Sequence, residues 1–274
     1  MMSGKQEELQ TAWADSFPLL GFLKESLAIA EVELKKLIRD PTELFTRAVQ
    51  PVLWIVIFGQ VFSRVRGIPT GTIGYLAFMT PGILAQSVLF SAIFYGIAVI
   101  WERDLGIIHK LLVSPARRGS LVFGKAISSG FRGFVQVVVI YFLAIAMGIG
   151  LRWQPYAILG VLFSVALGSA IFSTFSLIVA CIVKTRERFM GIGQLLTMPL
   201  FFASNAIYPL TLMPVWLRWF ARLNPLTYLV DSLRGLMITG GHSVHGFGVD
   251  FGVMLFVFII FLLIADRLYP TLVQ

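Results

Sequence analysis

Hydrophobic residues gather along this chain in long runs that polar residues seldom interrupt. Six runs approach or exceed the ~20 predominantly apolar residues that an α-helix needs to cross a lipid bilayer. They cover residues 44–63, 73–101, 120–149, 155–183, 189–208 and 247–265. The pattern predicts an all-α integral membrane protein with six transmembrane helices. Several of these must tilt or project beyond the bilayer because of their length.

The segment before the first run has a different pattern. Residues 19–39 predict an amphipathic helix, because hydrophobic side chains recur at helical spacing, at Leu23, Leu27, Ala30, Leu34 and Ile38. On another face Glu31 and Lys35 stand four residues apart, the spacing of a helical ion pair. Such a helix either lies in the membrane interface or packs on a soluble partner. We expect residues 1–43 to form a cytoplasmic N-terminus without a secretory signal, and residues 44–274 to form the transmembrane domain.

Composition supports the membrane interpretation, since 57% of the residues are hydrophobic, only 13% are charged, and the mean hydropathy is +0.85. Soluble domains typically hold about 45–50% apolar and about 25% charged residues. The single cysteine, Cys181, excludes an internal disulfide. His242 and His245 form an H-x-x-H pair in a glycine-rich loop, but no third ligand accompanies them, so we expect no metal site.

The distribution of lysine and arginine predicts the orientation of the helices. With the N-terminus inside, 15 of the 22 Lys and Arg residues lie on the cytoplasmic side and six on the outer side. The remaining one, Arg132, lies within a span. Six spans then place both termini in the cytoplasm of a multi-pass protein of the cell membrane. The net charge of +8 is therefore a topological signal, and we expect no nucleic-acid partner.

Residues 101–118, between the second and third runs, place charges of both signs around a short apolar stripe. Leu105, Ile108, Leu111 and Leu112 have helical spacing, and Ser114-Pro115 ends the turn. We expect a short amphipathic helix at the cytoplasmic surface, which either lies on the membrane or docks a partner.

The chain offers little of its own to power transport or to catalyse a reaction. No predicted span has Asp or Glu near its centre, where proton- and sodium-coupled carriers usually place ionisable groups. Residues 119–126 nearly spell a P-loop, but Ala126 stands where a hydroxyl is needed, and the segment leads into a span. We expect no catalytic residue and no cofactor on this chain, so any ATP and magnesium would bind another chain.

Two motifs resemble those of the type-2 ABC transporter permeases, the membrane subunits of exporters whose ATPase is usually a separate chain. The first is Glu-Arg-x-x-Gly from Glu102, followed by Leu-Leu-Val-Ser-Pro ending at Pro115 and by Gly124-Lys125. The second, Asn-Pro-Leu-Thr-Tyr-x-x-Asp-x-x-Arg, runs from Asn224 to Arg234. The resemblance covers nearly the whole chain, and the motif variants are closest to drug and lipo-oligosaccharide exporters.

The resemblance assigns roles to three segments. Residues 19–39 would be the interfacial elbow helix, and residues 208–234 would form outer re-entrant helices that close the pathway. A coupling helix that docks into the ATPase would comprise Glu102, Arg103, Asp104, Leu105, Gly106, His109, Lys110, Leu111, Ser114 and Pro115. The outer gate would comprise Tyr208, Pro209, Asn224, Pro225, Tyr228, Asp231 and Arg234.

The resemblance also implies a function. Two permease copies, identical or homologous, would form a pathway for an amphiphilic drug, lipid or lipo-oligosaccharide, driven by two ATPase subunits. Candidate pathway residues are Gln60, Phe90, Arg132, Phe201 and Asn205, although helix packing or lipid contact explains such side chains as well. A self-sufficient secondary carrier or channel and a membrane-embedded lipid-modifying enzyme remain as alternatives.

Overall fold

The computed structural model describes residues 18–39, 49–63, 73–108, 118–183 and 185–270. This part of the chain is helical, with turns and loops between the helices. Its one β feature is an isolated antiparallel bridge between Leu151 and Ile238, and the described residues contain no β-strand. The prediction of an all-α protein is confirmed.

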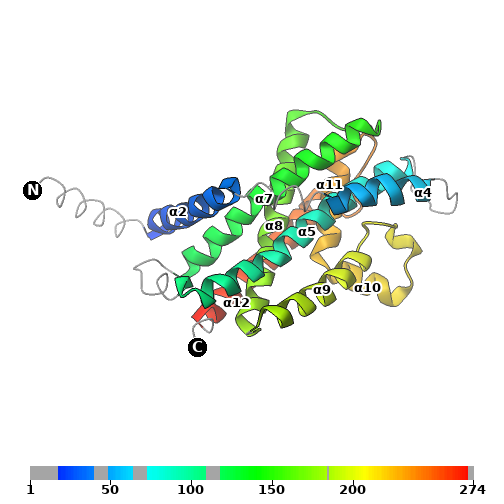
Figure 1. Cartoon of the computed structure of the whole chain (residues 1–274). Coiled ribbons are helices and arrows are strands. Elements are labelled where there is room, and N and C mark those ends of the chain that lie inside the picture. The colour runs from blue at the N-terminus through cyan, green and yellow to red at the C-terminus, as the bar shows by residue number, and fades with distance from the viewer. Residues whose placement is uncertain (1–17, 40–48, 64–72, 109–117, 184, 271–274) are drawn as a thin grey trace, which may run out of the picture.

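The helices follow the chain in the order drawn in Figure 1. A short apolar helix spans Val49–Ser63 and contains the π-helical turn η1 (Trp54–Gly59) and α4 (Gln60–Ser63). The other helices are α2 (Pro18–Arg39), α5 (Tyr75–Asp104), α7 (Arg118–Ala146), α8 (Pro155–Ile182), α9 (Arg186–Phe202), α10 (Val215–Leu223), α11 (Pro225–Met237) and α12 (Phe247–Leu268), with the 3-10 turn η2 (Leu210–Leu212) between α9 and α10.

Four described helices are long and apolar enough to cross a membrane, namely α5, α7 from Gly119, α8 and α12. They coincide within a few residues with the predicted spans 73–101, 120–149, 155–183 and 247–265. The ends of these four helices could be predicted from the sequence because each apolar run is long and ends near charged residues, glycine or proline.

The two other predicted spans differ from this picture. Only the part from Val49 onward of the predicted span 44–63 lies within the described residues, as a helix shorter than a bilayer requires. The helix α9 has 17 residues and ends at Phe202 rather than at residue 208. The Asn224 side chain donates hydrogen bonds to the carbonyls of Leu200 (2.6 Å) and Ala203 (3.4 Å), which are free because the helix stops there. The six-span count is therefore not confirmed.

The helices α5, α7 and α8 form the centre of the bundle, and α11 and α12 pack against α8 (Figure 1). In their most apolar stretches, 78% of α5 and 72% of α8 is buried inside the chain, against 17% of α12. Four of the large hydrophobic side chains that α12 exposes are Leu255, Phe256, Ile259 and Leu263. Membrane lipid or another protein must therefore cover most of α12.

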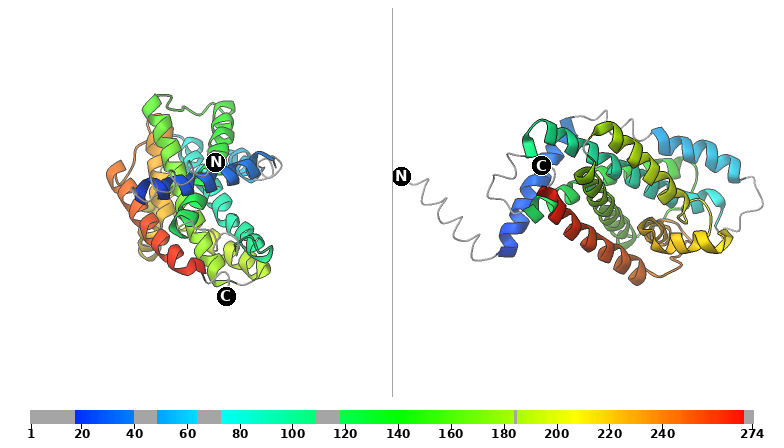
Figure 2. Two further views of the ribbon diagram at one scale, coloured as in Figure 1. Left: turned by 90° about the vertical axis from the view of Figure 1, so that its left-hand side faces the viewer. Right: turned by 90° about the horizontal axis from the view of Figure 1, so that it is seen from below.

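The amphipathic helix α2 lies across the end of the bundle at which α12 ends (Figure 2). It packs on α7, where a Cβ added to Gly124 would lie 2.6 Å from the Ser26 carbonyl oxygen. The predicted pair forms on the exposed face, with Lys35 Nζ 2.7 Å from the Glu31 carboxylate, and Lys35 lowers the pKa of that carboxyl. The boundary expected at residues 43–44 lies outside the described residues.

Gly82 is required where α5 meets the chain after α9. A Cβ at this position would lie 2.4 Å from the Ala206 carbonyl oxygen and 2.7 Å from its Cα. We expect Gly82→Ala to lower the free energy of unfolding by about 1–3 kcal/mol, because the two backbones must separate. Thermal unfolding of the purified protein in detergent measures the effect. The control is Gly252→Ala in α12, where no heavy atom lies within 4 Å, and equal melting temperatures would refute the close approach.

Candidate functional site

Two clusters of buried charged side chains lie near opposite ends of α5. The α2 cluster consists of Glu33, Glu102, Lys125 and Arg132, from α2, α5 and α7. The α11 cluster consists of Asp231, Arg234, Ser243, His245 and Asp250, from α11, the loop after it and α12. Buried charges must be paired or hydrogen-bonded, so each cluster fixes the elements that contribute to it.

In the α2 cluster two carboxylates face two cations. Lys125 Nζ lies 2.5 Å from Glu102 Oε2 and 3.7 Å from Glu33 Oε1, and Arg132 lies 3.8 Å from Glu33 Oε2. The Tyr95 ring lies beneath both cations, at 5.6 Å from Lys125 Nζ and 4.7 Å from Arg132 Cζ. The cluster is charge-balanced, and it ties α2 to the end of α5 and to the start of α7.

The predicted coupling segment begins inside this cluster. Glu102 was expected to face a docking partner, but the structure buries it against Lys125. Arg103 is partly exposed and pairs with the neighbouring Asp104 at 2.9 Å. Asp104 is exposed and also pairs with Arg186 of α9 at 2.7 Å. Leu105 is 67% exposed, and Gly106 has a φ of +70° at the turn that follows α5. The remaining coupling candidates, His109, Lys110, Leu111, Ser114 and Pro115, lie outside the described residues.

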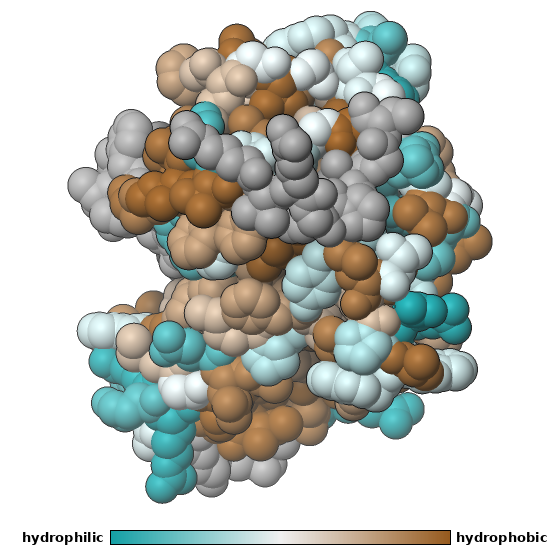
Figure 3. Space-filling model, turned by 90° about the vertical axis from the view of Figure 1, so that its right-hand side faces the viewer, coloured by the Kyte–Doolittle hydropathy of each residue, from teal (hydrophilic) through white to brown (hydrophobic). Residues whose placement is uncertain are grey.

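The second motif brings four segments together at the other end of the molecule. Asn224 caps α11 by accepting a hydrogen bond from Leu226 N at 3.0 Å, and its amide binds the end of α9. Pro225 fits the first turn of α11, since its nitrogen has no proton to leave unsatisfied. The Tyr228 hydroxyl donates to the Arg222 carbonyl (2.7 Å), which fixes α10. On the surface of this end, hydrophobic and hydrophilic residues are mixed (Figure 3).

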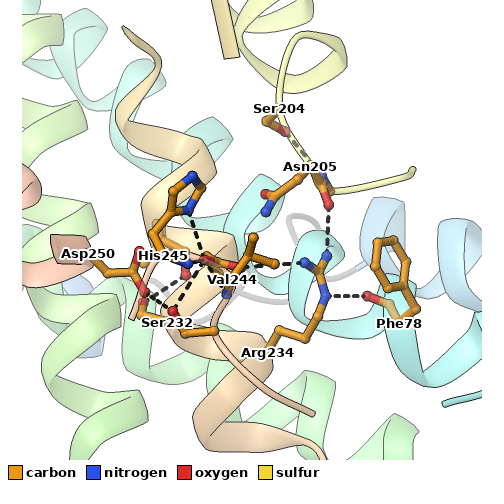
Figure 4. Close-up of polar contacts among 12 residues, drawn as sticks. Phe78, Ser204, Asn205, Ser232, Arg234, Val244, His245 and Asp250 are labelled. Carbon is orange, nitrogen blue, oxygen red and sulfur yellow. Dashed lines mark hydrogen bonds and ion pairs between the residues drawn. The ribbon is translucent and has the colours of Figure 1, made fainter. Parts of the chain in front are cut away.

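Arg234 connects α11 to α5 and to the turn after α9. Its guanidinium donates to the carbonyl oxygens of Asn205 (2.7 Å) and Phe78 (3.4 Å) and lies 3.8 Å from the centre of the Phe78 ring (Figure 4). The side chain is buried, and its nearest acidic partner is Asp231 Oδ1 at 3.9 Å.

Asp231 holds the loop between α11 and α12. Its Oδ2 accepts hydrogen bonds from the backbone nitrogens of Val244 (2.8 Å) and His245 (2.9 Å). The same oxygen lies 3.0 Å from His245 Nδ1 and 3.2 Å from Ser243 Oγ. Ser243 Oγ in turn lies 2.7 Å from Asp250 Oδ2. Through the Asn224–Arg234 motif, α11 therefore contacts the end of α9, α10, the start of α5 and the loop before α12.

The remaining outer-gate candidates lie before α10. The Tyr208 hydroxyl donates to the Phe202 carbonyl, and Pro209 precedes η2. The re-entrant prediction for residues 208–234 corresponds to two short helices, α10 and α11, of which α11 is buried from Leu226 onward.

The expected pathway residues lie in separate places. Phe90 lines a cavity of about 220 Å³ with Gln50, Pro51, Gln86, Ser87, Ser91 and Phe94, between the first apolar helix and α5. Gln60 is exposed on α4, whereas Phe201 is buried against Trp54, with ring centres 5.8 Å apart. Asn205 lies beside Arg234, and Arg132 belongs to the α2 cluster.

Several residues of the two clusters were not selected from the sequence. Glu33 follows Ser26 and Ala30 at helical spacing on the buried face of α2, and an acid on a buried face needs a partner. Lys125 belongs to a quoted motif, but its partner Glu102 precedes it by 23 positions. No local pattern could have joined Ser243, His245 and Asp250 to Asp231.

Four long apolar helices, an amphipathic helix across one end and two buried charge clusters define a helical membrane protein. Residues 25–238 match the family model described as ABC-2 type transporter, and the chain belongs to this family. It is the membrane permease of an ABC transporter, a type of subunit that normally works with an ATP-binding subunit. The matched region ends directly after α11, so it includes the α2 cluster and Arg234 but neither His245 nor Asp250.

Individual relatives agree with this assignment. Transport permease ycf38 of Cyanophora paradoxa is 29% identical over 262 residues, which cover 92% of this chain and 90% of that protein. Nodulation protein J of Rhizobium leguminosarum bv. trifolii is 25% identical over 71% of this chain and 73% of its own. Doxorubicin resistance ABC transporter permease protein DrrC of Mycobacterium tuberculosis is 23% identical over 80% of this chain and 79% of its own.

Proposed function

We propose that this permease forms, as a dimer with itself or a homologue, the export pathway for an amphiphilic substrate, driven by two separate ATPase subunits that bind ATP and magnesium. Both termini and the α2 cluster lie on the cytoplasmic side in this proposal, as the distribution of basic residues favours. The α11 cluster then lies at the outer surface of the cell membrane. The resistance and nodulation names of two relatives are compatible with a drug or lipo-oligosaccharide cargo.

The observation that carries this proposal is the double anchoring of the end of α5. On its buried side Glu102 is paired with Lys125, and on its exposed side Asp104 is paired with Arg186. The chain then continues into a turn that exposes Leu105. A partner that pulls on residues 103–115 therefore acts on α5 directly, and on α2, α7 and α9 through the ion pairs. This arrangement suits a subunit that receives force from outside, as a permease with a separate ATPase does.

The cavity beside Phe90 has a lining that suits an amphiphilic group, and its volume of about 220 Å³ holds part of a drug-sized molecule. Its lining combines the amides of Gln50 and Gln86 and the hydroxyls of Ser87 and Ser91 with the rings of Phe90 and Phe94. Gln86 is 3% exposed, and its Nε2 has no hydrogen-bond partner among the described residues. A mixed lining of this kind binds molecules that carry both apolar and polar groups.

We expect Arg103→Glu to reduce the amount of co-purifying ATPase by roughly tenfold, because reversing a charge at a docking surface costs about 1.4 kcal/mol or more. ATP-dependent export should fall with it, while membrane insertion and melting temperature stay near those of the wild type. Quantitative mass spectrometry of the purified complex measures the ratio of ATPase to permease.

The matched control is Arg222→Glu, the same substitution at an exposed arginine of α10 near the other end of the molecule. Normal ATPase association in Arg103→Glu, or an equal loss in the control, would contradict the docking role. Transport by the isolated permease in proteoliposomes under a proton gradient, without ATP, would instead favour a self-sufficient carrier.

A further inference from the structure

Two carboxylates of the α11 cluster are fully buried, although one oxygen atom of each has no hydrogen-bond partner among the described residues. Asp231 and Asp250 are both 0% exposed. Their Oδ2 atoms are hydrogen-bonded, but neither Oδ1 atom has a hydrogen-bond partner among the described residues. A buried acceptor without a partner is costly, and Asp231 Oδ1 has the Arg234 guanidinium at 3.9 Å, so Asp250 Oδ1 is the oxygen that points to a ligand beyond the polypeptide.

The Ser243 hydroxyl can donate a hydrogen bond to only one of the two aspartates. Ser243 Oγ lies within hydrogen-bond distance of the Oδ2 atoms of both aspartates, at 3.2 Å from Asp231 and 2.7 Å from Asp250. The hydroxyl has one proton and accepts a further bond from Gly246 N at 2.7 Å, so it satisfies only one carboxylate. The protein groups around the pair therefore provide fewer donors than two ionised carboxylates can accept.

The net charge of the α11 cluster also favours a bound ligand, and it indicates a cation. Arg234, at 3.9 Å from Asp231 Oδ1, compensates one of the two negative charges. With His245 neutral, one negative charge of the pair remains, in a place from which water is largely excluded. A bound cation would compensate it.

His245 supplies the third group. A nitrogen of its ring and one carboxylate oxygen from each of Asp231 and Asp250 lie within 4.8 Å of one another. Zinc binds nitrogen and oxygen ligands at about 2.0–2.2 Å, so three ligand atoms around one ion lie within roughly 4 Å of each other. To hold one ion, the three side chains would move slightly closer together than they lie here. Figure 4 shows the His245 and Asp250 side chains in one network of polar contacts.

We propose that Asp231, His245 and Asp250 bind a divalent transition metal ion of the zinc type. Two carboxylates and an imidazole are a ligand set that suits zinc, and water would complete the coordination. The His245 side chain is 23% exposed, which gives an ion access from the surface. The ion would join α11, the loop before α12 and the start of α12, adding to the hydrogen bonds of Asp231 and Ser243 that already link them. The site is independent of the ATPase and of the cargo.

The test uses the full-length permease in detergent, purified with an affinity tag that contains no histidine and stripped of metal with a chelator. Isothermal titration with zinc chloride should show about one ion per chain, and zinc should raise the melting temperature. Cobalt chloride should give visible absorption bands of a low-symmetry site with a nitrogen ligand. His245→Ala and Asp250→Asn should each weaken zinc binding by roughly tenfold or more.

His242→Ala is the matched control, because it removes the exposed histidine of the same loop and leaves the three ligands in place. It should bind zinc as the wild type does. The metal-free melting temperature of His245→Ala shows whether that variant is folded, which keeps the test valid if Asp250→Asn does not fold. The proposal fails if metal-free wild type takes up no zinc at about 1 mM, if His245→Ala binds normally, if His242→Ala loses binding, or if the site prefers magnesium or calcium.

Discussion

Lys125→Met is expected to lower the free energy of unfolding of this permease by about 3–5 kcal/mol, because it leaves a buried ion pair without its cation. Lys125 faces Glu102 at 2.5 Å and Glu33 at 3.7 Å, and its side chain is 4% exposed. In the variant, Glu102 loses the ammonium group of Lys125, and Glu33 keeps Arg132 at 3.8 Å. Thermal or denaturant unfolding in detergent, followed by tryptophan fluorescence, measures the loss.

The chain offers a matched control for this experiment. Lys35→Met makes the same substitution in the exposed Glu31–Lys35 pair, and such surface pairs contribute little to stability. Its melting temperature should stay at that of the wild type. The double variant Lys125→Met/Glu102→Gln should recover part of the loss, because the unpaired charge is then removed as well. Equal melting temperatures for Lys125→Met and Lys35→Met would refute the importance of the α2 cluster.

Arg234→Met is the second change with a large expected effect, again about 3–5 kcal/mol. It leaves Asp231 buried without its neighbouring cation and removes the two hydrogen bonds to Asn205 and Phe78. Besides a lower melting temperature, faster proteolysis is expected between α9 and α10, because Arg234 fixes that segment.

Arg222→Met is the comparison for Arg234→Met. The Arg222 side chain is exposed and lies 5.5 Å from the Trp219 ring, while the contact that matters to Tyr228 is made by its backbone carbonyl. This variant should unfold like the wild type. If Arg234→Met also unfolds like the wild type, the contacts of Arg234 with Asn205 and Phe78 do not stabilise this end of the bundle.

The sequence was sufficient to predict the elements that depend on local pattern. The apolar runs that became α5, α7, α8 and α12 are long, so their hydropathy alone determines their extent. The end of α9 differs from the prediction, which extended the helix to residue 208 although Ser204 and Asn205 interrupt the apolar run. The Asn224 amide, 24 positions beyond Leu200 in the sequence, binds the carbonyls left free at that end, and no local pattern indicates this contact.

For the candidate site, the sequence motifs indicate individual residues but not the contacts between them. Asn224, Tyr228, Asp231 and Arg234 were selected through a motif, and each of them makes a contact that joins elements. Glu102 belongs to the first motif, but its burial could not be foreseen, since its partner Lys125 lies on α7, 23 positions later in the sequence. His245 was judged to lack a third ligand because Asp231 comes near it only through the turn of the loop after α11.

The contact between Arg234 and the Phe78 carbonyl joins residues 156 positions apart, and this separation has a consequence for biosynthesis. A ribosome adds about 5–20 residues per second, so the start of α5 leaves the ribosome roughly 8–30 s before its partner in α11. During that interval this end of α5 lies in the translocon or the lipid with its neighbouring segments incomplete. The last third of the chain therefore closes the structure that the first third begins, and a nascent chain halted before α11 would present an unfinished surface to membrane quality control.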